Sequence, residues 1–236
     1  MRIVLAGSGT LASGIFEALL ASHHEVVALI QRKESQPRGV VSFVKRFFRR
    51  HFSLWDTAKI AEEHDIPIIL LDKEQEGDLD QLKARDPDII LVAGFNLILH
   101  ERVLWLPRSG CINCHPSLLP RHRGPNPYCA AILSNEKESG ITFHIMTKEI
   151  DAGPILAQFP FAIESRDTAG NLLERAAQTA SEHVTDVLDG FATGDLPAIP
   201  QDETRATYEK RLSLDDRTVK WRRPAREIDR LVRACF

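Results

Sequence analysis

The chain has 236 residues, of which 27% are charged and 43% are hydrophobic, and its formal net charge at pH 7 is -3. This length suits one domain, or one domain with an appendage, and the charge excludes a global basic field for nucleic acid while leaving room for a local basic patch. No apolar run reaches the roughly 18 residues of a membrane span, and no signal-peptide layout opens the chain. We therefore expect a cytoplasmic protein that makes no membrane contact.

The first part of the chain predicts a strand, a helix and a second strand, at residues 2–6, 11–21 and 25–30. The turn Gly7-x-Gly9-x-x-Ala12 fits a relaxed dinucleotide fingerprint, but Gln31-Arg32 stands where an NAD ribose would want an acid. The pattern favours a tight turn in a nucleotide-type fold with no NAD bound. An NADP-binding domain without group transfer is the alternative from another functional class.

Residues 31–53 are strongly basic, with seven lysines and arginines against one acid. Apolar residues recur within this segment at helical spacing, which predicts a basic amphipathic helix. Such a helix is either a solvated face over a docked apolar stripe or a contact for an anionic substrate such as tRNA or a nucleotide sugar; membrane contact is the remaining alternative.

Strands and helices then alternate: helix 55–64, strand 66–71, helix 78–84, strand 88–93 and strand 110–114. This alternation predicts a largely parallel sheet with right-handed crossovers. Ligands bind beyond the carboxyl ends of the strands in such sheets, which is where residues 7–10, residues 94–97 and His115 fall. We expect these three turns to converge on one crevice.

The remaining elements are expected to be helix 127–134, strands 141–146 and 155–163, long helix 168–191, a polar linker over 196–212 and a final helix 224–236. The fold class is therefore α/β, with a Rossmann-like, mostly parallel twisted sheet flanked by helices, followed by a C-terminal linker and a short helix.

The four cysteines are too few and too scattered for a disulfide framework. Cys111 and Cys114 match a Cys-x-x-Cys pattern, but an odd separation on a strand sends two side chains to opposite faces. We expect reduced, partly buried thiols rather than a redox or zinc pair.

Three polar residues suggest the chemistry. Asn113 and His115 lie two apart at the end of a predicted strand and so share a face, and Asp151 lies in a later loop. An amide and an imidazole can donate to an oxygen that gains negative charge when a carbonyl is attacked, and a carboxylate can orient the imidazole and raise its pKa. Ser117 has no Gly-x-Ser-x-Gly elbow around it, so direct transfer between two bound substrates is favoured over a covalent acyl-enzyme.

A family resemblance runs through the same residues. His115-Pro-Ser-Leu-Leu-Pro120, Gly124 and Asp151-Ala-Gly153 resemble the signature of the folate-dependent formyltransferases. The flanking Ala93-Gly-Phe-Asn-Leu-Ile-Leu99 and Gln201-Asp-Glu-Thr204, with Tyr208 and Leu212-Ser213, are similar to the members of that family that act on methionyl-tRNA. The resemblance implies 10-formyltetrahydrofolate as the formyl donor and catalytic roles for Asn113, His115 and Asp151.

The expected binding residues form two groups. The resemblance points to a pterin pocket made by Phe95, Asn96, Leu97, Ile98, Leu99, Met146, Ile150 and Gly153. Acceptor contacts are predicted from Gly9, Thr10, Ser117, Arg121, Arg123 and Gly124, with a solvated charge cluster as the alternative for the two arginines. No metal is expected, because His115, His122, His144 and Asp151 lack the spacing of metal ligands.

Two domains are expected: residues 1–195 as the catalytic domain, and residues 196–236 as a linker and the start of a second domain that the resemblance implies and this chain lacks. The expected partners are a small-molecule folate and an acceptor amine. The amine is methionyl-tRNA, or alternatively a nucleotide-linked amino sugar or a carrier-bound amino acid, and hydrolysis of the formyl donor by water is a rival reaction.

Overall fold

The structure is a computed structural model that describes residues 1–33, 57–72 and 76–235. Apart from residues 31–33, the basic segment 31–53 and the helix predicted within it lie outside these described residues.

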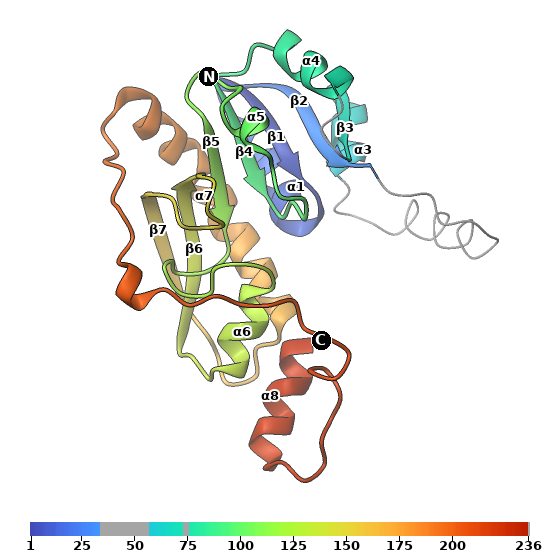
Figure 1. Cartoon of the computed structure of the whole chain (residues 1–236), viewed down its shortest axis with the longest axis vertical. Helices are drawn as coiled ribbons and strands as arrows, with labels where there is room; N and C mark the ends of the chain where they lie inside the picture. Colours follow the sequence, from blue (N-terminus) through green and yellow to red (C-terminus); the bar gives the residue numbers. More distant parts are fainter. Residues whose placement is uncertain (34–56, 73–75, 236) are drawn as a thin grey trace, which may run out of the picture.

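One sheet with the strand order β3-β2-β1-β4-β5-β6-β7 forms the centre of the described fold (Figure 1). Its strands are β1 (Arg2–Gly7), β2 (Glu25–Arg32), β3 (Ile68–Leu71), β4 (Ile89–Ala93), β5 (Cys111–His115), β6 (Glu138–Ile145) and β7 (Ile155–Ala162). The first five in chain order run parallel to one another, whereas β6 pairs antiparallel with β5 and β7 pairs antiparallel with β6. The mostly parallel sheet expected from the sequence is confirmed.

The helices are α1 (Gly9–Leu20), α3 (Thr57–Glu63), α4 (Glu76–Ala84), α5 (Glu101–Leu104), α6 (Pro127–Leu133), α7 (Ala169–Thr193) and α8 (Ala225–Cys235), with a 3-10 turn η1 (Glu203–Arg205). Their positions agree with the sequence predictions to within a few residues. Helix α5 was not predicted, because a single turn is too short to show a helical period.

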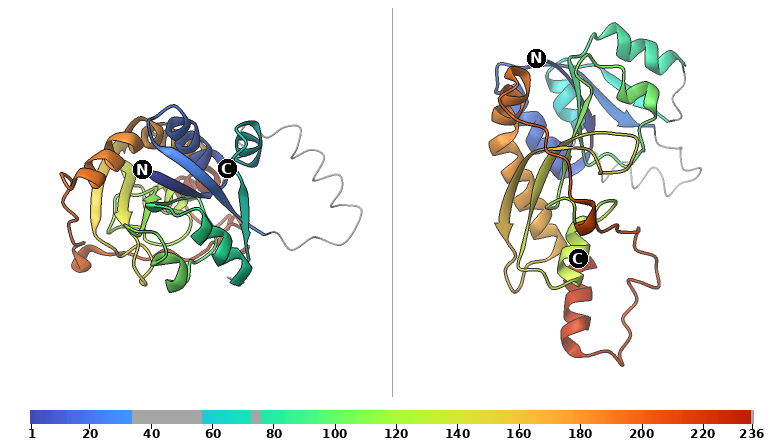
Figure 2. Two further views of the ribbon diagram at one scale, coloured as in Figure 1. Left: turned by 90° about the horizontal axis from the view of Figure 1, so that it is seen from above. Right: turned by 60° about the vertical axis from the view of Figure 1, so that its left-hand side comes forward.

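Helices cover both faces of the sheet (Figure 2), and an apolar layer lies beneath them on each face. Alternate residues of each buried strand point to opposite faces, so Ile3 and Leu5 of β1 pack under α1, α3 and α7, while Val4 and Ala6 pack under α4 and α5. The same alternation places Cys111 on the α4 and α5 side and Cys114 on the α1 and α7 side. All four cysteines are free, as the sequence predicted.

The buried thiols are expected to be unreactive in the folded protein. Burial raises the pKa of Cys111 to about 12 and that of Cys114 still further, whereas Cys235 is exposed. Because the thiolate is the reactive form, we expect a disulfide reagent at pH 8 to modify Cys235 first and Cys111 and Cys114 only after unfolding. Mass-spectrometric mapping of time-resolved labelling measures this, with Cys235→Ser as the control; rapid labelling of Cys111 in the native protein would contradict the buried strand.

Helix α7 is the longest described helix and has a defined start and end. The Thr168 side chain accepts from the backbone N–H of Asn171, and the Asn171 side chain accepts from the N–H of Thr168, which forms a capping box. Gly194 ends the helix in the left-handed conformation at φ 79. Among the described helices, neither α7 nor any other combines the length and apolar character needed to cross a bilayer.

The chain after α7 returns along the β7 edge and then crosses the molecule to α8, which packs against α6 (Figure 1). Ile199 pairs with Ile155 at the start of β7, and Tyr208 pairs with Arg123 beyond the end of β5. The segment that the sequence predicts as a linker is therefore bound to the body of the fold along part of its length.

Candidate active site

Three turns meet at the carboxyl edge of the parallel strands. The register places Gly7 of β1 beside Ala93 of β4, and Ala93 beside Cys114 of β5, so the segments that follow these residues emerge together. A Cβ on Gly7 would lie 2.0 Å from the carbonyl oxygen of Ala93, and one on Gly94 would lie 2.9 Å from that of Ser8. The three strand ends therefore lie side by side, and this depends on backbones that only glycine allows to approach so closely.

Asn113 and His115 lie on one face of β5, as their spacing predicts. They share this face with Cys111, which belongs to the core beneath α4 and α5. Strand β6 places His144 directly opposite Asn113, and the two side chains contact each other, with 3.2 Å between Nδ2 of Asn113 and Nε2 of His144. The end of β5 therefore carries an amide between two buried imidazoles.

Asp151 joins these groups through both of its carboxylate oxygens. Oδ1 accepts a hydrogen bond from Nδ2 of Asn113 at 3.2 Å and lies 3.6 Å from Nε2 of His144. Oδ2 accepts from the backbone N–H of Gly124 at 2.8 Å and lies 3.6 Å from Nδ1 of His115. Four groups from β5, β6 and the segment after β5 thus surround one carboxylate.

The loop that carries Asp151 reaches the cluster by folding back over the sheet. Because β6 is antiparallel to β5, it ends level with Ile112, and the N–H of Met146 donates to the carbonyl of Cys111 at 2.8 Å. Asp151 itself has a left-handed backbone with φ 52, and Gly153 lies so close to Ile145 that a Cβ would be 1.8 Å from its carbonyl oxygen. A tightly folded loop, rather than a strand end, therefore supplies the acid.

The hydrogen-bond partners assign the protons on the two imidazoles. Nδ1 of His144 faces the carbonyl of Ile145 at 3.0 Å and so carries the hydrogen, which leaves Nε2 to accept from the amide of Asn113. Nε2 of His115 faces the carbonyl of His122 at 2.9 Å and donates to it. Both N–H groups of Asn113 are consequently engaged, one by His144 and one by Asp151.

The pKa directions separate the charges of the acid and the base. Burial lowers the pKa of His115, and the Asp151 carboxylate and the His122 carbonyl oppose this only in part. Burial alone would raise the pKa of Asp151, but the charge of His115 or His144 whenever one of these rings is protonated, together with the Gly124 N–H, lowers it well below its usual range. Since the N–H groups of Gly124 and Asn113 are neutral donors, the carboxylate is favoured whatever the charge of His115. The site therefore favours the carboxylate form of Asp151 and the neutral form of His115.

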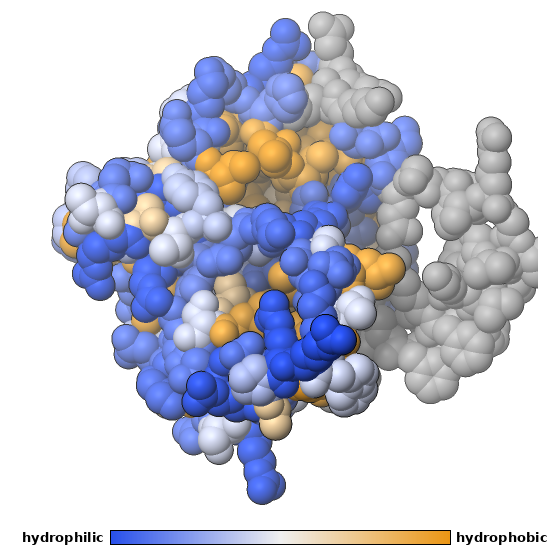
Figure 3. All heavy atoms as spheres, turned by 60° about the horizontal axis from the view of Figure 1, so that its bottom comes forward, coloured by the Kyte–Doolittle hydropathy of each residue, from blue (hydrophilic) through white to orange (hydrophobic). Residues whose placement is uncertain are grey.

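An apolar surface lies beside this cluster, in the segment that follows β4 and in the folded-back loop. Phe95, Leu97 and Met146 are half-buried against the core under α4 and α5, and Ile98 and Ile150 are exposed by 69% and 49%. Asn96 is exposed as well. Figure 3 turns toward the reader the end of the molecule to which the parallel strands point, and apolar side chains gather in a hollow on that face. The side chain of Leu99 is buried in the core, so this residue presents only its backbone to a ligand in that hollow.

Two of the predicted acceptor residues are corrected by the structure. Arg123 is fully buried, and its five N–H groups donate to Gln201, Glu203 and Tyr208, so none is left for a substrate. Ser117 is 1% exposed, and its hydroxyl donates to the carbonyl of Arg121 at 2.7 Å. Both side chains stabilise the fold around the cluster.

The other predicted acceptor residues lie in different places. Gly124 belongs to the cluster through its N–H, and Arg121 is half-exposed and paired with Glu136. Gly9 is exposed at the start of α1. Thr10 lines a hollow of about 580 Å³ between α1 and α7, on the face of the sheet opposite to Asn113 and His115. Thr10 therefore lies on the side of the sheet away from Asn113 and His115, whereas Gly9 follows Ser8, whose carbonyl lies against Gly94.

His144 and Gln201 complete the site and were not among the predicted site residues. The sequence considers His144 only as a metal ligand, because its position opposite Asn113 depends on an antiparallel register that the sequence does not reveal. Gln201 donates to the carbonyls of Asp151 and Gly153 at 2.9 and 2.7 Å from a segment that reads as a linker.

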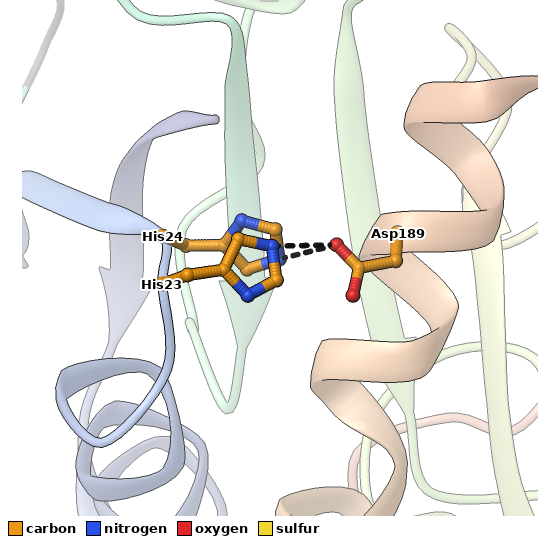
Figure 4. A group of neighbouring side chains, drawn as sticks. All are labelled: His23, His24 and Asp189. Carbon is orange, nitrogen blue, oxygen red and sulfur yellow. Dashed lines mark hydrogen bonds and ion pairs between the residues drawn. The ribbon is translucent and has the colours of Figure 1, made fainter.

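A separate histidine pair lies between the α1–β2 turn and α7 (Figure 4). Oδ1 of Asp189 lies 2.9 Å from Nε2 of His23 and 3.4 Å from Nε2 of buried His24. The N-terminal ammonium of Met1, which can only donate, lies 3.2 Å from Nδ1 of His24 and so places the ring hydrogen on Nε2. That proton occupies the lone pair through which His24 would bind a metal ion. The cluster instead ties the start of the chain to α7.

The comparisons with known proteins agree with the geometry. The family model described as "Formyl transferase" matches residues 1–188. A methionyl-tRNA formyltransferase of Pseudomonas fluorescens (strain SBW25) is 37% identical over 243 residues, which cover 99% of this chain and 71% of that protein.

Solved structures share the fold. An N-formyltransferase from Helicobacter canadensis, in complex with folinic acid and dTDP-3-aminofucose, superposes with a TM-score of 0.72 at 21% identity, over 99% of this chain and 80% of that one. A glycinamide ribonucleotide transformylase from Symbiobacterium toebii gives a TM-score of 0.65 at 21% identity, over 85% of this chain and 93% of that one. The matched family model and the identity to the Pseudomonas protein together show that this chain belongs to the formyl transferase family.

Proposed function

We propose that this protein transfers the formyl group of 10-formyltetrahydrofolate to the amino group of methionyl-tRNA. The observation that carries the reaction is the Asp151 carboxylate, which gathers Asn113 and His115 at the end of β5. The acceptor is supported by methionyl-tRNA formyltransferases that are 36–38% identical over 99% of the chain. Because aminoacylated tRNA is used by ribosomes, the proposal implies work in the cytoplasm.

The apolar surface beside the cluster is the proposed place of the folate. Phe95, Leu97 and Met146 offer the flat, half-buried lining that a pterin ring needs, and the exposed Ile98 and Ile150 extend it. Because the surface follows directly from β4 and from the loop of Asp151, a ring bound there brings its formyl group close to Asn113. Folinic acid in the Helicobacter structure supports a reduced folate as the donor.

The reaction proceeds by direct attack on the formyl carbon. The lone pair of the acceptor amine forms the new C–N bond while the carbonyl oxygen takes the negative charge, which an N–H donor of Asn113 stabilises. The bond to N10 of the folate then breaks, the amine proton leaves through water, and N10 receives a proton. Asp151 stabilises positive charge on His115 during this exchange.

The side chain of Asn113 must break one of its hydrogen bonds when substrates bind. Both N–H groups of Asn113 are engaged in the structure, by His144 and Asp151. The amide must therefore exchange one of these partners for the formyl oxygen. The two contacts are equally long, at 3.2 Å, and the one with Asp151 already binds a negatively charged oxygen, whose place the formyl oxygen takes as it gains charge.

A panel of amines tests the proposal. Purified protein is supplied with 10-formyltetrahydrofolate and, separately, methionyl-tRNA, uncharged tRNA, a dTDP-linked amino sugar and free amino acids, and both the formylated product and free formate are measured. We expect formylmethionyl-tRNA, and a loss of turnover of about 100- to 1000-fold in Asn113→Ala, because an oxyanion donor is removed. Formylation of the amino sugar alone, or formate without any amine, would assign the protein to the corresponding rival reaction.

A further inference from the structure

The segment after α7 contacts the residues around the active site. Its residues 199–209 are here called the strap. At its first residue, Ile199 exchanges two backbone hydrogen bonds of 2.8 Å with Ile155 at the start of β7. At its end, the N–H of Glu209 donates to the carbonyl of Arg123 at 2.8 Å, and the N–H of Arg123 donates to that of Thr207 at 2.9 Å. The strap thus runs alongside the segment that leaves β5, as Figure 2 also shows.

Within the strap, Gln201 holds the backbone of the loop that carries Asp151. Its Nε2 donates to the carbonyl of Asp151 at 2.9 Å and to the carbonyl of Gly153 at 2.7 Å. Asp151 has a left-handed backbone, which a residue with a side chain adopts only at a cost in free energy. One side-chain amide therefore fixes the two carbonyls that flank this strained turn.

Arg123 holds Gln201 in the required orientation. The guanidinium has only donors, so the atom of Gln201 that faces it must be the oxygen, which accepts from Nε at 3.1 Å and from Nη2 at 2.8 Å. This fixes the NH2 group of Gln201 toward the Asp151 loop. The remaining donors of Arg123 bind Glu203 at 2.7 and 2.9 Å and the hydroxyl of Tyr208 at 2.6 Å.

The same segment reaches the other side of the carboxylate. Gly124, the residue after Arg123, donates its N–H to Oδ2 of Asp151, and a Cβ on Gly124 would lie 2.7 Å from the carbonyl oxygen of Glu209 in the strap. His122, the residue before Arg123, accepts at its carbonyl from His115 and donates its N–H to the Thr207 hydroxyl at 2.8 Å. The strap therefore contacts the partners of both the acid and the imidazole.

We propose that Gln201 and Arg123 are positioning residues that hold Asp151 for catalysis, and that the catalytic unit extends through residue 209. Neither residue contacts substrate; both act through the loop of residues 146–154. This inference rests on the proposed function for its kinetic consequence, whereas its structural part concerns the loop alone. It moves the boundary of the catalytic unit from residue 195, which the sequence predicts, into the segment read as a linker.

The kinetic test compares Gln201→Ala in the full chain with the matched control Gln178→Ala, which removes the same side chain from the exposed face of α7, where it donates to Glu182. We expect kcat with methionyl-tRNA to fall about 10- to 100-fold in Gln201→Ala while KM for the folate donor changes less than about two-fold, because a catalytic group misplaced by 1 Å costs on the order of 100-fold. The effect should nearly vanish when both proteins also carry Asp151→Asn, since Gln201 acts through Asp151. An equal loss in both backgrounds, or no loss at all, overturns the proposal.

A second measurement needs no substrate. Hydrogen exchange of the Gly124 amide reports the bond to Asp151, and we expect Gln201→Ala to accelerate it at least about 10-fold, while exchange in β1 and β4 stays unchanged. Unchanged exchange at Gly124 would show that Gln201 does not hold the loop. Absence of formyl transfer by the unaltered protein, together with accelerated exchange in Gln201→Ala, would refute the proposed function and leave the strap in place.

Discussion

Replacement of Asp151 by Asn is expected to lower kcat for formyl transfer by about 100- to 1000-fold, with little change in KM for either substrate. The amide keeps the size of the carboxylate but loses its charge, so it no longer stabilises a positive charge on His115. It also replaces one carboxylate oxygen by an NH2 group. In the unaltered protein the two oxygens accept from Gly124 and Asn113, so the new NH2 group must face one of these N–H donors. The loss therefore falls on the transition state and not on substrate binding.

The same variant has a predicted effect on pH dependence. Burial lowers the pKa of His115, while the charge of Asp151 raises it, so removing that charge lowers the pKa further. If neutral His115 is the active form, kcat/KM falls as the pH drops through this pKa. The acid limb of the profile should consequently move to lower pH in Asp151→Asn, measured with methionyl-tRNA as the acceptor.

A matched control is available on the surface. Asp80 in α4 is 75% exposed at its side chain and pairs with Lys83, so Asp80→Asn removes the same charge without touching the cluster. Turnover and acid limb should both stay as in the unaltered protein. An acid limb that stays in place in Asp151→Asn would show that His115 is not the group that titrates.

Gly153→Ala is expected to be the most destabilising single methyl addition in the loop. The added Cβ would lie 1.8 Å from the carbonyl oxygen of Ile145, which is backbone and cannot rotate away. The loop must shift, and with it the carbonyls that accept from Gln201. We expect a loss of about 2 to 3 kcal/mol of unfolding free energy, measured by urea denaturation, together with a large loss of activity.

Gly110→Ala is the control that separates a clash from backbone strain. Gly110 has a positive φ of 81, and a Cβ there would meet nothing within 4 Å. Its replacement should cost only the left-handed strain of about 1 kcal/mol and leave turnover intact. Equal destabilisation by the two variants would mean that the loop of residues 146–154 accommodates a side chain.

The sheet could be predicted because its signals are local. Short buried runs such as those of β1 and β4 alternate with amphipathic helices, and this succession specifies parallel strands. The antiparallel edge could not be predicted in this way. The residues that connect β5, β6 and β7 do not indicate whether the next strand runs parallel or antiparallel. The four-residue α5 has no periodic signal at all.

The candidate site could be predicted where it depended on the alternation of side chains between the two faces of a strand. Asn113 and His115 share a face for that reason, and Asp151 was correctly placed in a loop. His144 was out of reach because its position opposite Asn113 is a matter of register. Arg123 reads as an exposed, substrate-facing residue in a loop that also holds Arg121, yet residues 78 to 85 positions later cover it completely.

The path of the strap has a consequence for the protein while it is being made. The residues of β5 and of the Asp151 loop leave the ribosome well before residues 201–209, and domains begin to fold as their segments emerge. A nascent chain can therefore form its sheet early yet cannot lock its acid in place until synthesis has passed the strap. Activity would then begin only with nearly the whole described chain released, so unfinished polypeptides would not consume the donor.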